Sequence, residues 1–124
     1  MITKNKIPYP TESEEQKALI KWWAFQYPQF DHLLFHIPNG GLRNLKTAVR
    51  LKAEGVKPGV ADLFLAIPSG GFHGLFIEMK RQHGNCQTET QKQFQEAVQR
   101  QGYFYLLARG WIAAKDGIER YLGK

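Results

Sequence analysis

Two short apolar runs constrain what this chain can fold into more than any other feature. Residues 61–67 (ADLFLAI) and 74–80 (GLFIEMK) are separated by a turn cluster at 68–71 (PSGG). Continuous apolar runs of this length, bounded by proline and glycine, are typical of central strands that are covered on both faces. We therefore predict that the two runs pair as an antiparallel hairpin within a larger sheet.

Three charged residues interrupt these runs. Asp62 stands at the start of the first run, and Glu78 and Lys80 stand at the end of the second. Alternate side chains of a strand point to the same face, so Glu78 and Lys80 share one. The start of one hairpin strand lies beside the end of the other, which brings Asp62 close to this pair. Because strands shed charge that is not used, the three residues predict a site.

The chemistry of such a site follows from its two carboxylates. Asp62 and Glu78 would repel each other or share a proton unless a cation lay between them. A hard divalent ion with oxygen ligands, Mg²⁺ or Mn²⁺, resolves that conflict. Such an ion polarises a phosphoryl oxygen and acidifies bound water, and Lys80 is placed to position or activate the water. The pattern predicts metal-assisted hydrolysis of phosphodiesters.

Each of these residues also has a plainer interpretation. A carboxylate such as Asp62, after a Pro-Gly turn, is often only a turn cap. Glu78 and Lys80 could form a simple salt bridge at a sheet edge, which contributes little to stability. The plainer interpretation is the stronger one for any single residue, whereas the combination favours a site.

The charge of the chain favours a polyanionic partner. Among its 124 residues, 17 Lys and Arg face 11 Asp and Glu, for a net charge of +6, and an excess of this kind attracts nucleic acid. The basic residues are concentrated between 43 and 57, although a solvated helix face would have the same composition. The loop at 39–43 precedes a helix N-terminus and is equally consistent with a phosphate contact or a plain turn. The predicted nucleic-acid contacts are Asn39, Arg43, Lys46, Arg50 and Lys57.

Length and composition predict one soluble domain. The chain can bury a core without disulfides, and its single cysteine, Cys86, rules out an intrachain disulfide and suits a reducing cytoplasm. No apolar run approaches the ~20 residues of a membrane span, and the first ten residues lack the hydrophobic segment of a secretory signal. We expect a cytoplasmic protein without a membrane partner.

The remaining pattern predicts an α/β fold with the order αβαββαβα, a mixed β-sheet flanked by helices on both sides. The first helix, at 12–26, begins with three acids and carries Trp22, Trp23 and Phe25, which we assign to the core. Helices are further expected at 42–54, from 88 or 90 to 101, and at 113–122, and strands at 32–37, 61–67, 74–80 and 103–108.

The motifs resemble those of the VRR-NUC branch of the PD-(D/E)XK nucleases. The resemblance begins with Pro58-Gly59, Ala61-Asp62-Leu63 and the run from Gly74 to Lys80. It extends over about residues 12–122, through IPNGG at 37–41, Arg43-Asn44, Gln91, Gly102-Tyr103 and the acidic helix around Glu14. Ala61 stands where a proline is common, a difference that affects no ligand.

This resemblance implies a restriction-endonuclease-like core and metal-dependent cleavage of DNA. It implies that Asp62, Glu78 and the Met79 carbonyl bind the metal, that Lys80 is the catalytic lysine and that Gln91 lies beside the site. A glutamate of the first helix joins them, for which Glu14 is the best match and Glu15 the alternative.

The resemblance also implies a stand-alone nuclease domain over 1–124, with residues 1–11 as a flexible segment, and a homodimer that acts on branched DNA as junction resolvases do. The alternatives are a monomeric nicking or flap-type nuclease and a non-catalytic nucleic-acid-binding module of the same fold.

Overall fold

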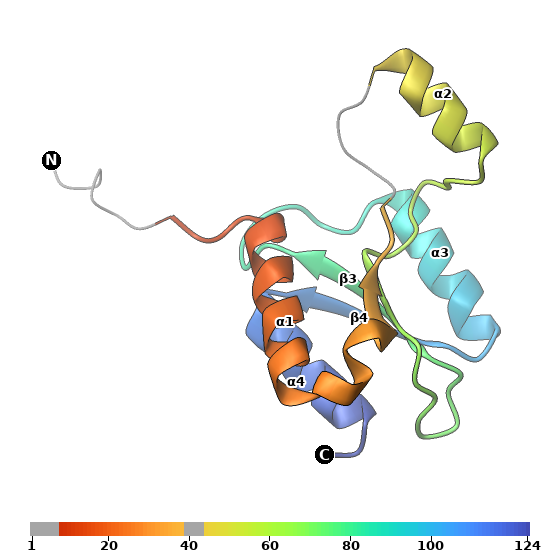
Figure 1. The fold of residues 1–124 in the computed structure, drawn as a ribbon. Coiled ribbons are helices and arrows are strands. Elements are labelled where there is room, and N and C mark those ends of the chain that lie inside the picture. Colours follow the sequence, from red (N-terminus) through yellow and green to blue (C-terminus); the bar gives the residue numbers. More distant parts are fainter. Residues whose placement is uncertain (1–7, 39–43) are drawn as a thin grey trace, which may run out of the picture.

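A four-stranded mixed sheet forms the centre of the molecule in the computed structural model, which describes residues 8–38 and 44–124 (Figure 1). Its strands are, in spatial order, β1 (Leu34–His36), β2 (Leu63–Leu65), β3 (Leu75–Lys80) and β4 (Phe104–Arg109). β1, β2 and β3 pair antiparallel, and β4 is parallel to β3. The predicted hairpin is present, with Leu63 opposite Ile77.

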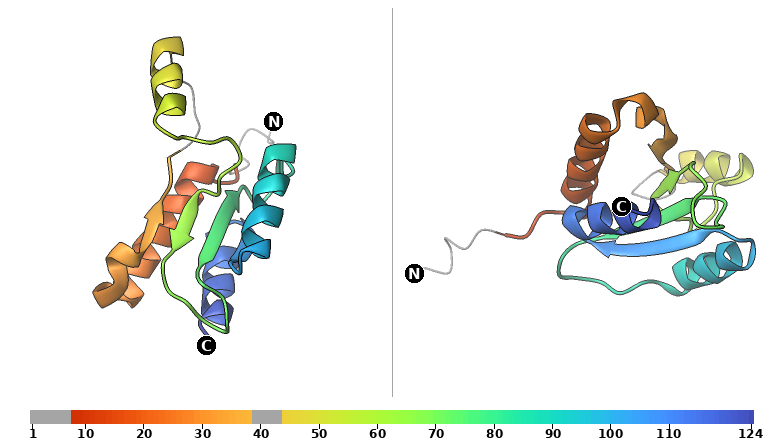
Figure 2. Two further views of the ribbon diagram at one scale, coloured as in Figure 1. Left: turned by 90° about the vertical axis from the view of Figure 1, so that its right-hand side faces the viewer. Right: turned by 90° about the horizontal axis from the view of Figure 1, so that it is seen from below.

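Helices cover both faces of this sheet. They are α1 (Glu12–Gln26), α2 (Leu45–Ala53), α3 (Glu89–Arg100) and α4 (Trp111–Tyr121), with a 3₁₀ segment, η2 (Pro28–Leu33), between α1 and β1. α1 and α4 lie on one face and α3 lies on the other, as the two views of Figure 2 show. The predicted fold class and element order are confirmed, and η2 is the addition, because Pro28 starts a new turn after ending α1.

The main core fills the space between the sheet and the α1/α4 layer. Leu19 and Trp23 of α1 pack against Ile77 of β3 and Ile118 of α4, and none of the four is more than 1% exposed. Trp22 is partly buried against this core. The assignment of Phe25 to the core was wrong, since its side chain is 85% exposed. Two helical steps turn Phe25 about 200° away from the stripe that Trp23 occupies.

A close approach of two backbones fixes the start of β2. The loop at 57–62 crosses the first turn of α3, and a Cβ added at Gly59 would overlap the carbonyl of Thr90. Gly59 also has φ +83°, a conformation that favours glycine. Only glycine therefore lets this loop lie against α3, next to Asp62 and Gln91. Among the described helices, none is long and apolar enough to cross a membrane.

Candidate active site

The sheet topology brings four of the predicted site residues to one edge. Because β1, β2 and β3 alternate in direction, the end of β1, the start of β2 and the end of β3 lie together. Asp62 immediately precedes β2, Glu78 and Lys80 lie in the last half of β3, and Gln91 lies in the first turn of α3, which covers the same face.

Gln91 connects the acid and the base of β3. Its Nε2 donates to Glu78 Oε2 over 2.9 Å, and its Oε1 accepts from Lys80 Nζ over 3.1 Å. The same Oε1 accepts from the backbone N–H of Thr88 over 2.8 Å, as part of the capping box that begins α3. Lys80 Nζ lies 3.9 Å from Glu78 Oε2. The helix cap thus holds Gln91 in the one orientation that bridges Glu78 and Lys80.

A backbone hydrogen bond holds the Asp62 carboxylate toward β3. Its Oδ2 accepts from the backbone N–H of Met79 over 2.7 Å, so the carboxylate points at the strand that carries Glu78. The Met79 side chain is buried in the core on the other face. The metal-ligand role of the Met79 carbonyl stays a prediction.

The surroundings of the two carboxyl groups raise the pKa of each. Glu78 is only 3% exposed. Burial, followed by the charge of Asp62, raises the pKa of Glu78 to about 8, although Lys80 opposes the rise. Burial also raises the pKa of Asp62, against the lowering effect of the Met79 N–H. Glu78 Oε1 is buried and, among the described residues, has no hydrogen-bond partner.

These features fit a hard divalent cation. A buried carboxylate oxygen without a donor is costly, and a neighbouring carboxylate adds repulsion that a cation would remove. Within residues 8–38 and 44–124, no group of three or more His, Cys, Asp or Glu side chains has metal-binding geometry. An ion would therefore rest on Asp62, Glu78, a carbonyl and water, a set that suits Mg²⁺, which keeps several waters and needs only one or two carboxylates.

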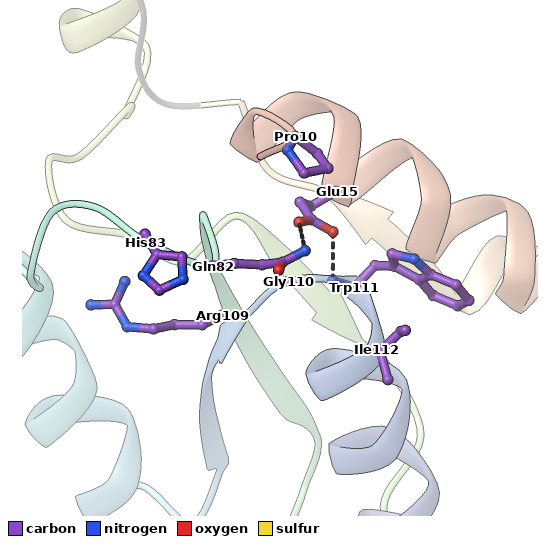
Figure 3. Close-up of a pocket in the computed structure, with 8 residues that line it drawn as sticks. All are labelled: Pro10, Glu15, Gln82, His83, Arg109, Gly110, Trp111 and Ile112. Atoms are coloured by element: carbon purple, nitrogen blue, oxygen red, sulfur yellow. Dashed lines mark hydrogen bonds between the residues drawn. The ribbon is translucent and has the colours of Figure 1, made fainter. Parts of the chain in front are cut away.

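The three acids at the start of α1 have different surroundings. Glu14 is exposed, and its Oε1 accepts from the Thr11 N–H over 2.8 Å to complete the helix cap. Glu15 is 1% exposed, and its two oxygens accept from the Trp111 N–H and Gln82 Nε2, each over 2.9 Å (Figure 3). Glu12 is the acid of this turn whose charge raises the pKa of Glu78. The structure thus places Glu14 in a cap, and its role as a metal ligand stays a prediction.

One further residue, His36 at the end of β1, approaches the site without a prediction from sequence. His36 Nδ1 lies 2.9 Å from the carbonyl oxygen of Asp62 and 3.1 Å from Gln16 Nε2. The charge of His36 lowers the pKa of Asp62. Only the β1–β2 register, which pairs His36 with Leu63, reveals this position.

Three of the predicted nucleic-acid contacts are among the described residues, and all three are exposed. Lys46 and Arg50 are exposed on α2, and Lys57 is exposed in the loop that leads to Asp62. Arg50 Nη1 pairs with Glu54 Oε1 over 3.1 Å. Asn39 and Arg43 lie outside the described residues, as does most of the predicted flexible segment at 1–11.

Comparison with known proteins decides the family. The sequence profile described as the VRR-NUC domain matches residues 5–111. The chain belongs to the VRR-NUC family. A solved structure described as a VRR_NUC domain protein is similar to this one with a TM-score of 0.81 and 28% identity, over 94% of this chain and 91% of that chain. No curated protein matches. Membership in the VRR-NUC family implies a nuclease of the PD-(D/E)XK type, and it confirms the resemblance drawn from the motifs.

Proposed function

We propose that this VRR-NUC protein is an endonuclease that hydrolyses DNA phosphodiester bonds with Mg²⁺ or Mn²⁺. The observation that carries the proposal is the pairing of buried Glu78 with partly buried Asp62. Glu78 Oε1 has no partner among the described residues, and Glu78 Oε2 lies 3.9 Å from the Lys80 ammonium. A structural salt bridge needs neither the second carboxylate nor the orphan oxygen.

Each side chain has a separate task in this mechanism. Asp62, Glu78 and the Met79 carbonyl would hold the ion, which when bound supplies positive charge to a phosphoryl oxygen and lowers the pKa of water. Gln91 fixes the position of Lys80 Nζ through a 3.1 Å hydrogen bond. Lys80 is then placed to hydrogen-bond the attacking water and to stabilise the negative charge that develops on the phosphate.

Charge and topology support DNA as the substrate. The net charge of +6 is carried in part by α2 and the loop after it, which reach the sheet at the same edge as Asp62. Lysine and arginine contacts to phosphate give affinity that falls steeply with salt. We propose further that the protein is a homodimer selective for branched DNA, because two sites related by a two-fold axis can cut two strands of one junction.

The test is a cleavage panel of four-way, flapped, single-stranded and duplex DNA with Mg²⁺, Mn²⁺, Ca²⁺ or chelator. Lys80→Met should abolish cleavage while DNA affinity stays nearly unchanged, and Lys21→Met, an exposed change on α1, should keep both. Cleavage that survives in Lys80→Met would exclude the mechanism.

Native mass measured together with the four-way junction assay separates a dimeric resolvase from a monomeric nicking or flap-type enzyme. Salt-dependent DNA binding without turnover under every metal condition would identify a non-catalytic binding module.

A further inference from the structure

Helix α2 is separate from the packed layers of the molecule. None of its residues, 45–53, is buried. Figure 1 and the left view of Figure 2 show α2 standing clear of the sheet and of the other helices. A helix this short is marginal in water on its own, so a helix that stands clear of the other described elements is expected to have a partner outside its own domain.

The surface of α2 combines apolar and basic side chains. Leu45 and Val49 are 80% and 60% exposed, and their spacing of four residues places them on one stripe of the helix. Basic residues flank this stripe at Lys46, Arg50 and Lys52, all exposed. Two large aliphatic side chains in water beside a row of cations fit a partner that has both phosphates and apolar faces.

The position of α2 ties this surface to the active site. α2 is inserted between the end of β1 and the start of β2, at the edge where Asp62 and Lys80 lie. The chain returns from α2 to Asp62 through the loop that Gly59 holds against Thr90. One stretch of chain therefore leads from the surface of α2 to the carboxylate pair.

We propose that α2 is a wedge that recognises branched DNA, an inference that rests on the proposed nuclease function. Leu45 and Val49 contact bases that are unstacked at the branch point, while Lys46 and Lys52 bind the flanking phosphates. Aliphatic side chains inserted beside bases are a recurrent means of holding DNA in a non-helical geometry. α2 thus selects the shape of the substrate, and the residues of the sheet edge cut it.

A second copy of this chain fits the α2 surface less well. Two α2 helices packed on each other would bring their basic residues together, and within residues 45–54 only Arg50 has an acidic partner, Glu54. The contact would also be small, since stable interfaces bury about 800 Å² on each partner and α2 exposes only two large apolar side chains. Charge complementarity therefore favours DNA.

The test is the double variant Leu45→Ser/Val49→Ser, measured on four-way and linear DNA of the same length. Cleavage of the junction should fall by about tenfold, because burying even one aliphatic side chain contributes this much, while cleavage of linear single strands stays within about twofold. A 2-aminopurine placed at the branch point should brighten when wild type binds in Ca²⁺ and should brighten much less with the variant.

The matched control is Phe25→Ser, which removes an equally exposed apolar side chain from α1, away from this edge. It should leave the junction preference and the fluorescence unchanged. The inference is overturned if the double variant loses linear and branched substrates equally, if it changes neither, or if its main effect is a loss of dimer mass. The fluorescence readout needs no turnover, so a failure of the nuclease proposal and a failure of the wedge give different results.

Discussion

Two buried glutamates at this edge differ in how their oxygens are satisfied. Glu15 on α1 and Glu78 on β3 are 1% and 3% exposed. Both oxygens of Glu15 accept a hydrogen bond, one from the N-terminus of α4 and one from Gln82. Glu78 has one oxygen without a donor among the described residues and a second carboxyl group beside it. Burial alone does not mark a functional acid, whereas burial without satisfied hydrogen bonds does.

The largest expected contrast is in cleavage. Glu78→Gln keeps the shape and the contact with Gln91 but removes the charge that would hold a cation. We expect the cleavage rate to fall by about a thousandfold or more, equivalent to roughly 4 kcal/mol of transition-state stabilisation. Single-turnover rates under saturating Mg²⁺ measure this effect. Glu96→Gln, an exposed change on α3, is the control, and a fall of less than tenfold in Glu78→Gln would remove Glu78 from the mechanism.

The second contrast is in stability, where we expect Glu15 to matter more than Glu78. Glu15→Ala removes a buried side chain and leaves the partly buried Trp111 N–H without its acceptor, so unfolding free energy should fall by about 2–3 kcal/mol. Metal-free Glu78→Gln should change stability little near pH 7, because burial and the charge of Asp62 raise the pKa of Glu78 to about 8 and a neutral glutamine then replaces a protonated acid of the same shape. Urea titration of both variants tests the pair. If Glu78→Gln were the more destabilised of the two, our distinction between a structural and a functional glutamate would be wrong.

Metal binding should distinguish an acid of the site from an exposed acid. Mn²⁺ in large excess over its Kd should stabilise the wild type by mass action. At a hundredfold excess, the free energy of unfolding should rise by about 2–3 kcal/mol, and the melting temperature should rise with it. Asp62→Asn should remove most of this rise. Asp31→Asn, an exposed change in η2, should preserve it. A Mn²⁺ effect that is equal in all three proteins would place the cation elsewhere.

Two properties of strands were enough to predict most of the site. Alternate residues of a strand share a face, and the start of one hairpin strand lies beside the end of the other. Alternation in 74–80 placed Glu78 and Lys80 on one face, and antiparallel pairing brought Asp62 to them. The motif Thr11 to Glu14 is the signature of a capping box, and it indicates that Glu14 completes a helix cap. This signal is local, since it needs only residues within one helical turn.

Other features depend on tertiary structure and have no local signal. His36 approaches Asp62 only because β1 pairs with β2 in one register. The distinction between Glu12, Glu14 and Glu15 depends on how α1 sits against β3 and α4. Phe25 was misassigned because a dense apolar run, KWWAF, does not reveal where its buried stripe ends. The amphipathic pattern of α2 predicts a packed helix, whereas in the structure none of its residues is buried.

The smallest expected effect is the pH dependence of the metal-free protein. The pKa of Glu78 is raised from its ordinary 4.5 to about 8 in the folded state, so the folded state binds a proton that the unfolded state has released. This contribution to stability is full below about pH 4.5 and is lost as pH rises through 8. With chelator present, the melting temperature should decline by a few degrees for each pH unit between pH 5 and 8.

Glu78→Gln should flatten this decline, because it removes the carboxyl group whose raised pKa causes it. The raised pKa of Asp62 acts in the same direction, so the variant would keep only a residual slope. A wild-type protein whose melting temperature rose over this range would show that the pair is already ionised without metal, and the electrostatic reason for a cation at this edge would then be lost.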